Sequence, residues 1–312
     1  MAKSMHKYSI ASIRKDFKWN WPLYLMMVPV IVYYLMFAYV PMFGNIMAFK
    51  EFVPGMGIKG FFAGEWVGLK YFKQFIEGIY FSRLVRNTIM ISLLNLIFSF
   101  PAPIILAILL SELPFKGYKR VVQTITYLPH FISTVVICGL IVNFSLSTGL
   151  FNDIIELLGG ERVSLLQDPK YFRTIYVASG IWQGVGWGSI IYLSAIAGID
   201  QALYEAAKID GANKFQQIIH VTIPGISNTI IILFIMQVGS MMSVGSEKIL
   251  LLYNPSIYET SDVISTYVYR VGLVQMNWSF SAAIELFNKA INFILLLSAN
   301  AISKRVSEVS LM

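Results

Sequence analysis

Residues 205–224 read EAAKIDGANKFQQIIHVTIP, a polar stretch that interrupts two long runs without a charged residue. The first run covers residues 174–199, and the second begins inside the stretch and covers 215–246. Three further charge-free runs lie earlier in the chain, at 19–49, 87–111 and 121–152. Each run exceeds the roughly 20 residues that an α-helix needs to cross the hydrocarbon of a bilayer. The polar stretch therefore lies within a polytopic membrane protein.

The composition also indicates a membrane protein. The 312 residues are 56% hydrophobic and 13% charged, against roughly 25% charged in an ordinary soluble domain, and the mean hydropathy is +0.66. A sixth apolar segment is interrupted by Glu285 and Lys289. We expect an all-α fold with six transmembrane helices, at about 22–43, 87–110, 122–145, 174–198, 226–245 and 279–303.

The basic residues indicate the orientation of the chain. The net charge is +7, but its carriers do not form one patch, so the charge does not indicate nucleic-acid binding. They cluster before the first predicted span, between the second and third, and after the last: Arg14, Lys15, Lys18, Lys116, Lys119, Arg120, Lys304 and Arg305. An excess of Lys and Arg in short cytoplasmic loops predicts that both termini are cytoplasmic.

No constellation of catalytic or metal-binding side chains stands out. The single cysteine, Cys138, lies within a predicted span and fits a small buried apolar residue. There is no G-x-x-x-x-G-K-[ST] phosphate loop, and the cytoplasmic loops are too short to hold a nucleotide-binding domain. We expect no catalytic residue, no metal and no cofactor in this chain. Any energy for transport must come from a partner subunit or an ion gradient.

The 205–224 stretch itself predicts two short helices at an angle. Glu205 opens a run of strong helix formers, and Gly211 permits a change of direction. After it, Phe215, Ile218, Ile219 and Thr222 predict one apolar stripe, with Asn213, Lys214, Gln216 and Gln217 facing away. Pro224 either ends the segment or opens the next helix. Periodicity alone leaves two interpretations open, a helix resting on lipid headgroups and a helix that fills a groove in a partner protein.

The stretch resembles the EAA motif of ABC importer permeases, in which Glu-Ala-Ala is followed by Gly and later by aliphatic-x-aliphatic-Pro. Those positions are occupied by Glu205, Ala206, Ala207, Gly211, Val221, Ile223 and Pro224. Asp210 and Ala212 resemble the form common in the sugar branch. Four other parts resemble carbohydrate-uptake permeases, in the subgroup for oligosaccharides and polysaccharide fragments: Asn87-Thr88, residues 127–133, Trp182 with Gly186, and residues 261–270.

The resemblance implies a type I ABC importer permease fold in a bacterial inner membrane. It implies that the 200–224 loop docks into an ATPase subunit, with coupling residues Glu205, Ala206, Ala207, Asp210, Gly211, Phe215 and Pro224. The implied partners are two ATPases, which hold the ATP and Mg²⁺, a second homologous permease, an extracytoplasmic solute-binding protein, a saccharide and membrane lipid. We expect three regions: 1–84 with the first span, a permease core at 85–303 and a cytoplasmic tail at 304–312.

Polar and aromatic groups near the bilayer midplane are the candidates for the substrate path. Gln183 and Trp187 are i, i+4 on the fourth predicted span, as are Gln237 and Met241 on the fifth, and Ser133 lies on the third. Each also has an interpretation as helix packing. Glu285 and Lys289 are i, i+4 and fit a self-neutralised pair, with a gate or a contact to an acidic sugar as the alternative.

Three alternatives remain at the level of sequence. An ABC permease for a non-sugar solute would keep the coupling stretch. An ion-coupled secondary transporter would need a membrane-embedded carboxylate or a broken-helix ion site, and Glu285, with Lys289 nearby, is the only carboxylate in a predicted span. A multi-span membrane enzyme would need a catalytic cluster, and none is evident.

Overall fold

The computed structural model describes residues 10–52, 59–60 and 64–307, and these are mostly helical. In them the one strand-like pairing is a single bridge between Lys50 and Trp66. The N-terminal part contains α1 (Ile10–Tyr34), a π turn (Leu35–Tyr39), α2 (Val40–Met42), a 3-10 helix (Phe43–Phe49), α4 (Lys70–Ile76), α5 (Phe81–Leu94), a π turn (Asn95–Ser99) and α6 (Pro101–Glu112).

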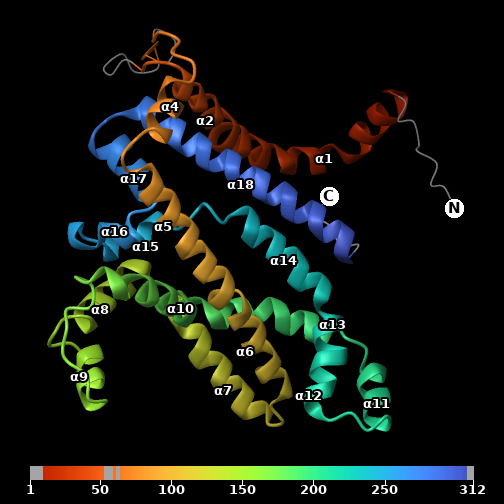
Figure 1. Ribbon diagram of the computed structural model, residues 1–312. Helices are drawn as coiled ribbons and strands as arrows, with labels where there is room; N and C mark the ends of the chain where they lie inside the picture. The colour runs from red at the N-terminus through yellow and green to blue at the C-terminus, as the bar shows by residue number, and fades with distance from the viewer. Residues whose placement is uncertain (1–9, 53–58, 61–63, 308–312) are drawn as a thin grey trace.

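The middle of the chain forms α7 (Lys116–Tyr127), a 3-10 helix (Leu128–Phe131), α8 (Thr134–Phe144), α9 (Leu150–Leu157), α10 (Pro169–Ala197), α11 (Gln201–Ile209), α12 (Lys214–Gln217), a π turn (Ile218–Thr222), α13 (Ile223–Gly225) and α14 (Ser227–Gly239). The C-terminal part forms α15 (Ser246–Leu252), a 3-10 helix (Pro255–Ile257), α16 (Tyr258–Ser261), α17 (Ile264–Tyr269), a π turn (Arg270–Val274) and α18 (Trp278–Ser307). Figure 1 shows α14 and α18 running side by side and α11 with α12 at one end of the molecule.

Among the described residues, three helical segments are long and apolar enough to cross a membrane: 16–49, 81–112 and 278–305. Two bent pairs pass the same test together, 116–131 with 134–144 and 214–225 with 227–239. The number of candidate spans is therefore three, or up to five if each bent pair counts as one. Six spanning helices are not confirmed, because α10 is 29 residues long but is not among these candidates.

The third predicted span, 122–145, is broken rather than continuous. A 3-10 turn over Leu128–Phe131 separates α7 from α8, and the two halves are bent by 96°. Pro129 lies in this turn, where it cannot donate a helical hydrogen bond. Ser133 then begins a new helix, because its side chain accepts a hydrogen bond from the backbone N–H of Val136.

The fifth predicted span, 226–245, is shorter than expected. It is helical only over Ser227–Gly239, and residues beyond it form a turn that leads to α15. A Cβ on Gly239 would lie 2.6 Å from the side chain of Leu296, so this end of α14 approaches α18 very closely. The helix therefore ends where α18 crosses it.

The prolines of the second predicted span are accommodated within one long helix. The π turn Asn95–Ser99 precedes Pro101, and the N–H of Phe100 donates to the carbonyl of Asn95. Pro103 packs against α10, because a Cβ on Gly188 would lie 3.0 Å from its ring. The π turn thus accommodates the two prolines, which lack a backbone N–H, where the helix packs against α10.

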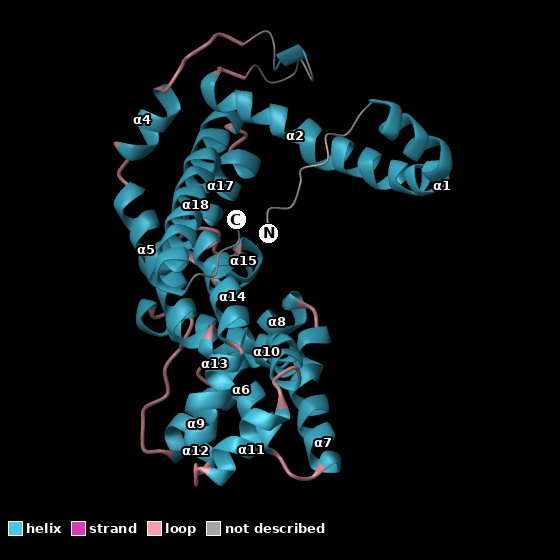
Figure 2. Cartoon of the chain, turned by 90° about the vertical axis from the view of Figure 1, so that its right-hand side faces the viewer, coloured by secondary structure: helices cyan, strands magenta, loops and turns pink. Residues whose placement is uncertain are grey.

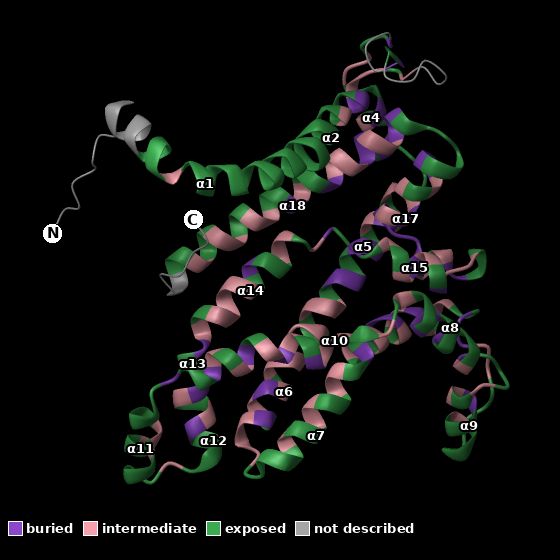
Figure 3. Ribbon diagram, turned by 180° about the vertical axis from the view of Figure 1, so that it is seen from behind, coloured by how far each residue is buried: buried purple, intermediate pink, exposed green. Residues whose placement is uncertain are grey.

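The first helix projects away from the rest of the chain (Figure 2). None of the best membrane-crossing window of residues 16–49 is buried within the molecule, and α1 is exposed along its described side chains (Figure 3). The connection to the body is the 3-10 helix Phe43–Phe49, in which Met47 and Ala48 are buried against the cluster that contains α18.

The core consists of three clusters along the bundle. One joins α8, α10 and α15 around Phe172 and Ile249, and a second joins α4, α5 and α18 around Phe75 and Ile284. The third joins α6, α10 and α14 around Tyr192, next to the polar stretch that interrupts the apolar runs. The clusters hold α10 as the central element, which contacts α6, α7, α14 and α16.

Candidate functional site

The candidate coupling segment begins with α11. Asp200 caps this helix by accepting a hydrogen bond from the N–H of Ala202 at 3.0 Å. The helix ends at Gly211, whose φ of +77° lies in the left-handed region. The N–H of Ala212 donates to Ala207 and that of Gly211 to Lys208, which is the Schellman pattern of a helix C-terminus. The predicted elbow at Gly211 is confirmed.

The second helix starts with a reciprocal cap. The N–H of Gln216 donates to Asn213 Oδ1 at 2.9 Å, and the N–H of Asn213 donates to Gln216 Oε1 at 2.8 Å. The helix continues through the π turn Ile218–Thr222 into α13. Of the two expectations for Pro224, the second is confirmed, because it lies in the first turn of α13 and so opens a helix, while the 62° bend falls at Ile226.

The predicted apolar stripe is wrong at three positions. Phe215 and Ile219 are 70% and 40% exposed, whereas Gln217, expected to face outward, is 4% exposed. Gln217 is buried because its Nε2 donates to the carbonyl of Ala212 at 2.8 Å and so closes the elbow. Thr222 is buried as expected, and its hydroxyl lies 3.0 Å from that of Tyr204, which ties the two helices together.

The predicted coupling residues lie on an accessible surface. Glu205, Ala206, Asp210, Gly211, Phe215 and Pro224 are exposed, and Ala207 is half-buried. Ile209 and Leu203 are also exposed, at 86% and 54%. The segment therefore presents the carboxylates of Glu205 and Asp210 beside apolar side chains that nothing in the described chain covers.

One ion pair joins this segment to the bundle. Lys214 Nζ lies 2.6 Å from Glu112 Oε2, at the last residue of α6. The lysine side chain is 70% exposed and the glutamate 28%. The sequence analysis did not identify this pair, although Glu112 is the residue that ends a charge-free run. The segment therefore contacts the end of α6 directly through this ion pair.

Three of the five path candidates gather at the break between α7 and α8. Gln183 Nε2 donates to the carbonyl of Ile132 at 3.5 Å, next to Ser133. The Trp187 ring stacks on His130 with centroids 4.5 Å apart and planes at 3°. His130 is exposed. Ser133, Gln183 and Trp187 thus form one group.

The other two candidates do not share a helix face. Gln237 is exposed on α14, while Met241 lies beyond the helix end, where its carbonyl accepts a hydrogen bond from the Ser92 hydroxyl. The i, i+4 argument fails because the helix stops at Gly239. Among the described residues, no hydrogen bond or ring contact joins these two to the group at the α7–α8 break.

A buried charge network was not predicted from residue chemistry. Asp262 is fully buried and pairs with Arg83 at 3.0 Å and Arg270 at 2.8 Å. Asn87 is also fully buried, donates to the carbonyls of Glu259 and Asp262, and accepts from Arg173 at 2.9 Å. The resemblance to carbohydrate-uptake permeases includes Asn87 and residues 261–270, but no local sequence pattern predicts that these residues contact each other.

The coupling segment and the helical bundle can be compared with known proteins. The family described as "Binding-protein-dependent transport system inner membrane component" matches residues 23–308. The chain belongs to this family. Family membership confirms the resemblance drawn from residues 205–224 and makes the chain a multi-pass transport permease, which is not itself an enzyme. No group of three potential metal-binding side chains occurs in the part of the chain that the structure describes.

Individual members of the family are similar over nearly the whole permease. "Protein LplB" of Bacillus subtilis (strain 168) is 43% identical over 97% of this chain and 93% of its own length. The "Polygalacturonan/rhamnogalacturonan transport system permease protein YteP" of the same strain is 41% identical over 92% of this chain and 88% of its own length. A chain of a bacterial ABC transporter "involved in the import of the acidic polysaccharide alginate" has a TM-score of 0.86 and 43% identity, covering 95% of this permease and 99% of that chain.

Proposed function

We propose that this permease is the transmembrane subunit of an ATP-driven importer and forms the path for an oligosaccharide delivered by a solute-binding protein. The observation that carries the proposal is the similarity to a chain of the alginate importer, at 43% identity and a TM-score of 0.86 over 95% of the permease. A second structure of a bacterial alginate transporter, in complex with a pentasaccharide-bound periplasmic protein, has a TM-score of 0.87 and 42% identity. Transport proceeds by alternating access.

The coupling role is assigned to residues 200–224. Two ATPase subunits supply ATP and Mg²⁺, and each coupling segment inserts into one ATPase. The exposed Phe215 and Ile209 support a docking role, since apolar side chains at a cytoplasmic elbow gain free energy when a protein groove covers them. Glu205 pairs with a basic residue of the ATPase, and Gly211 sets the angle between the two helices. The Lys214–Glu112 pair transmits the movement to α6.

The proposed topology has six spans with both termini in the cytoplasm of a bacterial cell. Each bent pair crosses once, and α10 is the remaining span beside the three long apolar helices. A second homologous permease completes the path. The division into 1–84, 85–303 and 304–312 stays a prediction, and residues 1–9 and 308–312 lie outside the described residues.

Purification of the native complex in mild detergent, followed by mass spectrometry, tests this proposal. We expect an ATPase, a second permease and this chain to co-purify, and Glu205→Gln or Gly211→Val to lose the ATPase. Gly211→Asn is the matched control, because Asn tolerates a positive φ that Val does not. Glu161→Gln, at an exposed site away from the segment, controls for loss of one carboxylate. Transport by the chain alone, without ATP, would contradict the proposal and favour an ion-coupled carrier.

A further inference from the structure

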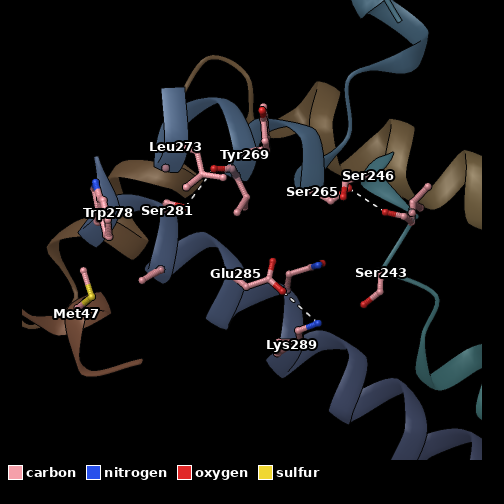
Figure 4. A pocket seen from close by; sticks show the side chains of 16 residues that line it. Met47, Ser243, Ser246, Ser265, Tyr269, Leu273, Trp278, Ser281, Glu285 and Lys289 are labelled. Carbon is pink, nitrogen blue, oxygen red and sulfur yellow. Dashed lines mark hydrogen bonds and ion pairs between the residues drawn. The ribbon is translucent and has the colours of Figure 1, made fainter. Parts of the chain in front are cut away.

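A cavity of about 640 Å³ opens beside the first half of α18. Its walls come from α18, from α17 with the π turn that follows it, from the turn after α14, and from Met47. Figure 4 shows Trp278 at one end and Ser243 and Ser246 at the other, with Glu285 and Lys289 between them. The volume falls within the range of about 300–1,000 Å³ that is usual for small-molecule sites.

One face of α18 carries the polar side chains of this cavity. Trp278, Ser281, Glu285 and Lys289 recur at i, i+3, i+7 and i+11 and therefore form one stripe. Seven residues of α-helix separate Trp278 from Glu285, which is about 10 Å along the axis. The stripe lies in a candidate membrane span, where charged side chains are costly and usually face a water-filled cavity or the bundle interior.

Glu285 and Lys289 are the charged side chains among the described residues that line the cavity. Lys289 Nζ lies 3.1 Å from Glu285 Oε1, and their side chains are 58% and 39% exposed. The predicted self-neutralised pair is therefore formed, but it faces open space. An ammonium has three donors and a carboxylate several acceptor positions, so one contact leaves capacity on both groups. The cavity thus offers a strong donor and a strong acceptor side by side at zero net charge.

Hydroxyl and amide groups surround the pair. The Ser265 hydroxyl donates to the carbonyl of Val244 at 2.9 Å and the Ser281 hydroxyl to that of Val268 at 3.2 Å, so both oxygens can still accept. Asn288 is 1% exposed and donates to the carbonyl of Met242 at 3.1 Å. Its Oδ1 finds no donor among the described residues, and a buried acceptor without a partner calls for an explanation.

Two aromatic rings complete the lining. Trp278 and Tyr269 are each 43% exposed at the cavity. Trp278 stacks on Phe52 with centroids 5.7 Å apart and planes at 23°, which fixes the orientation of the indole. A fixed, half-exposed aromatic surface next to hydrogen-bonding groups suits a ligand that has one apolar face and several polar edges.

We propose that this cavity binds one ring of the transported saccharide, with ring hydroxyls bridging Lys289 and Glu285 and the apolar ring face against Trp278. A hydroxyl both donates and accepts, so neighbouring hydroxyls satisfy an ammonium and a carboxylate at once. A carboxylate on the sugar would gain from Lys289 but would be repelled by Glu285. The site therefore recognises the hydroxyls of the sugar rather than its charge. This inference rests on the proposed function.

Uptake by the complete transporter, reconstituted in proteoliposomes with its ATPases, second permease and binding protein, tests the site. The labelled probes are trigalacturonate, trimannuronate, arabinotriose and maltotriose. Uptake of none of them by the wild type would contradict the proposed function and this inference together. For the probe that is imported, we expect Glu285→Gln/Lys289→Met to lower uptake about tenfold or more, because hydrogen bonds to charged groups are lost.

A charge-swapped variant separates binding from stability. Glu285→Lys/Lys289→Glu keeps an i, i+4 ion pair but exchanges the positions of donor and acceptor, so we expect a melting temperature close to the wild type and uptake that remains low. Lys73→Met/Glu77→Gln removes an exposed i, i+4 pair of similar kind outside the cavity and should leave uptake unchanged. Uptake restored by the swap, or unaffected by the neutral pair, would overturn the inference.

Discussion

The carboxylate of Asp262 illustrates how one residue organises the side of the bundle where α5, α10 and α16 meet. It is fully buried, and two arginines from different elements reach it, Arg83 from α5 and Arg270 from the turn after α17. The guanidinium groups are themselves partly buried. Burial by itself lowers the pKa of Arg270, but the hydrogen bond that it donates to Asp262 and the charges of the neighbouring acidic groups together raise it above its ordinary value. A charge in this position is tolerated only while it is paired.

Replacement of Asp262 by Asn is expected to destabilise the permease by about 3–5 kcal/mol, because two buried arginines lose their counter-charge. Thermal unfolding of the purified protein in detergent measures this change. Asp153→Asn removes a carboxylate that is half-exposed in an ion pair with Arg162, and it should cost less than about 1 kcal/mol. Equal effects of the two substitutions would contradict the role assigned to the buried network.

Lys248 is a second residue with an unusual environment. It lies on α15, outside the candidate spans, and its Nζ donates to the carbonyl of Tyr176 at 3.1 Å and lies 5.0 Å from the centre of the Tyr176 ring. Burial lowers its pKa from 10.5 to about 8. The folded state therefore holds this proton less tightly than the unfolded state does.

This lowered pKa predicts a pH dependence of stability. Between the folded pKa of about 8 and the unfolded value of 10.5, the unfolded chain binds more protons, so stability rises with pH. The contribution is fully present above the unfolded pKa and is lost as the pH falls through about 8. Melting temperatures of wild type and Lys248→Met across this window test it. The melting temperature of the wild type should rise relative to that of the variant as the pH rises. Parallel curves of melting temperature against pH would argue against a buried charged lysine.

Among the helices, α10 shows how close packing depends on single glycines. A Cβ on Gly186 would lie 2.1 Å from the backbone oxygen of Thr126 on α7, which no side-chain rotation can relieve. Gly184, half a turn earlier on the same helix, has nothing within 4 Å of the same position. Both glycines lie within the same helix, but an added Cβ would clash with α7 at Gly186 and would meet open space at Gly184.

We therefore expect opposite effects from the same substitution at the two sites. Gly186→Ala should destabilise by about 1–3 kcal/mol, because α7 and α10 must separate. Gly184→Ala should be neutral or stabilise by up to about 1 kcal/mol, since alanine favours the helix. Thermal unfolding of both variants decides the question, and destabilisation by Gly184→Ala would mean that α10 is covered there by another protein chain.

The long helices and the elbow at Gly211 could be predicted from sequence, but the break between α7 and α8 and the burial pattern over residues 215–222 could not. Charge-free length predicted residues 87–110 correctly as helix, apolar composition did so for 279–303 despite Glu285 and Lys289, and Gly211 predicted the elbow. The break in 122–145 was not predicted, because a charge-free run indicates length but not continuity, and the cap at Ser133 starts a new helix after Pro129. The stripe over residues 215–222 was misassigned because a uniform helical period ignores the π turn and the amide of Gln217.

At the scale of the whole molecule, the way in which the two bent helix pairs lie in the membrane decides the topology. Two helix pairs change direction by 96° and 62°, and α1 has no buried contact of its own with the bundle. If each pair crosses once and α10 crosses as well, α9 and the coupling segment lie on opposite sides. The basic loop at 116–120 then lies on the same side as the coupling segment.

Cysteine labelling in intact cells tests this topology. The natural Cys138 is 1% exposed and should stay silent. A membrane-impermeant maleimide should label cysteines placed at the exposed Gln74 and Glu161 without permeabilisation, but those at Lys116 and Lys208 only after it. Labelling of Glu161→Cys only from the inside would show that the α7–α8 pair turns back without crossing.

The sequence by itself determined the membrane class, the mostly helical fold and the elbow at Gly211. These are properties of local composition and spacing, because hydrophobic length, charge and a left-handed glycine act over a few residues. Only the tertiary structure decided which polar residues are buried and which face a cavity. Arg83 meets Asp262 across 179 positions of sequence, and the polar stripe of α18 becomes a site only because the turn after α14 closes over it. Such contacts depend on how helices cross, and crossing is set by the close packing of many side chains rather than by any one segment.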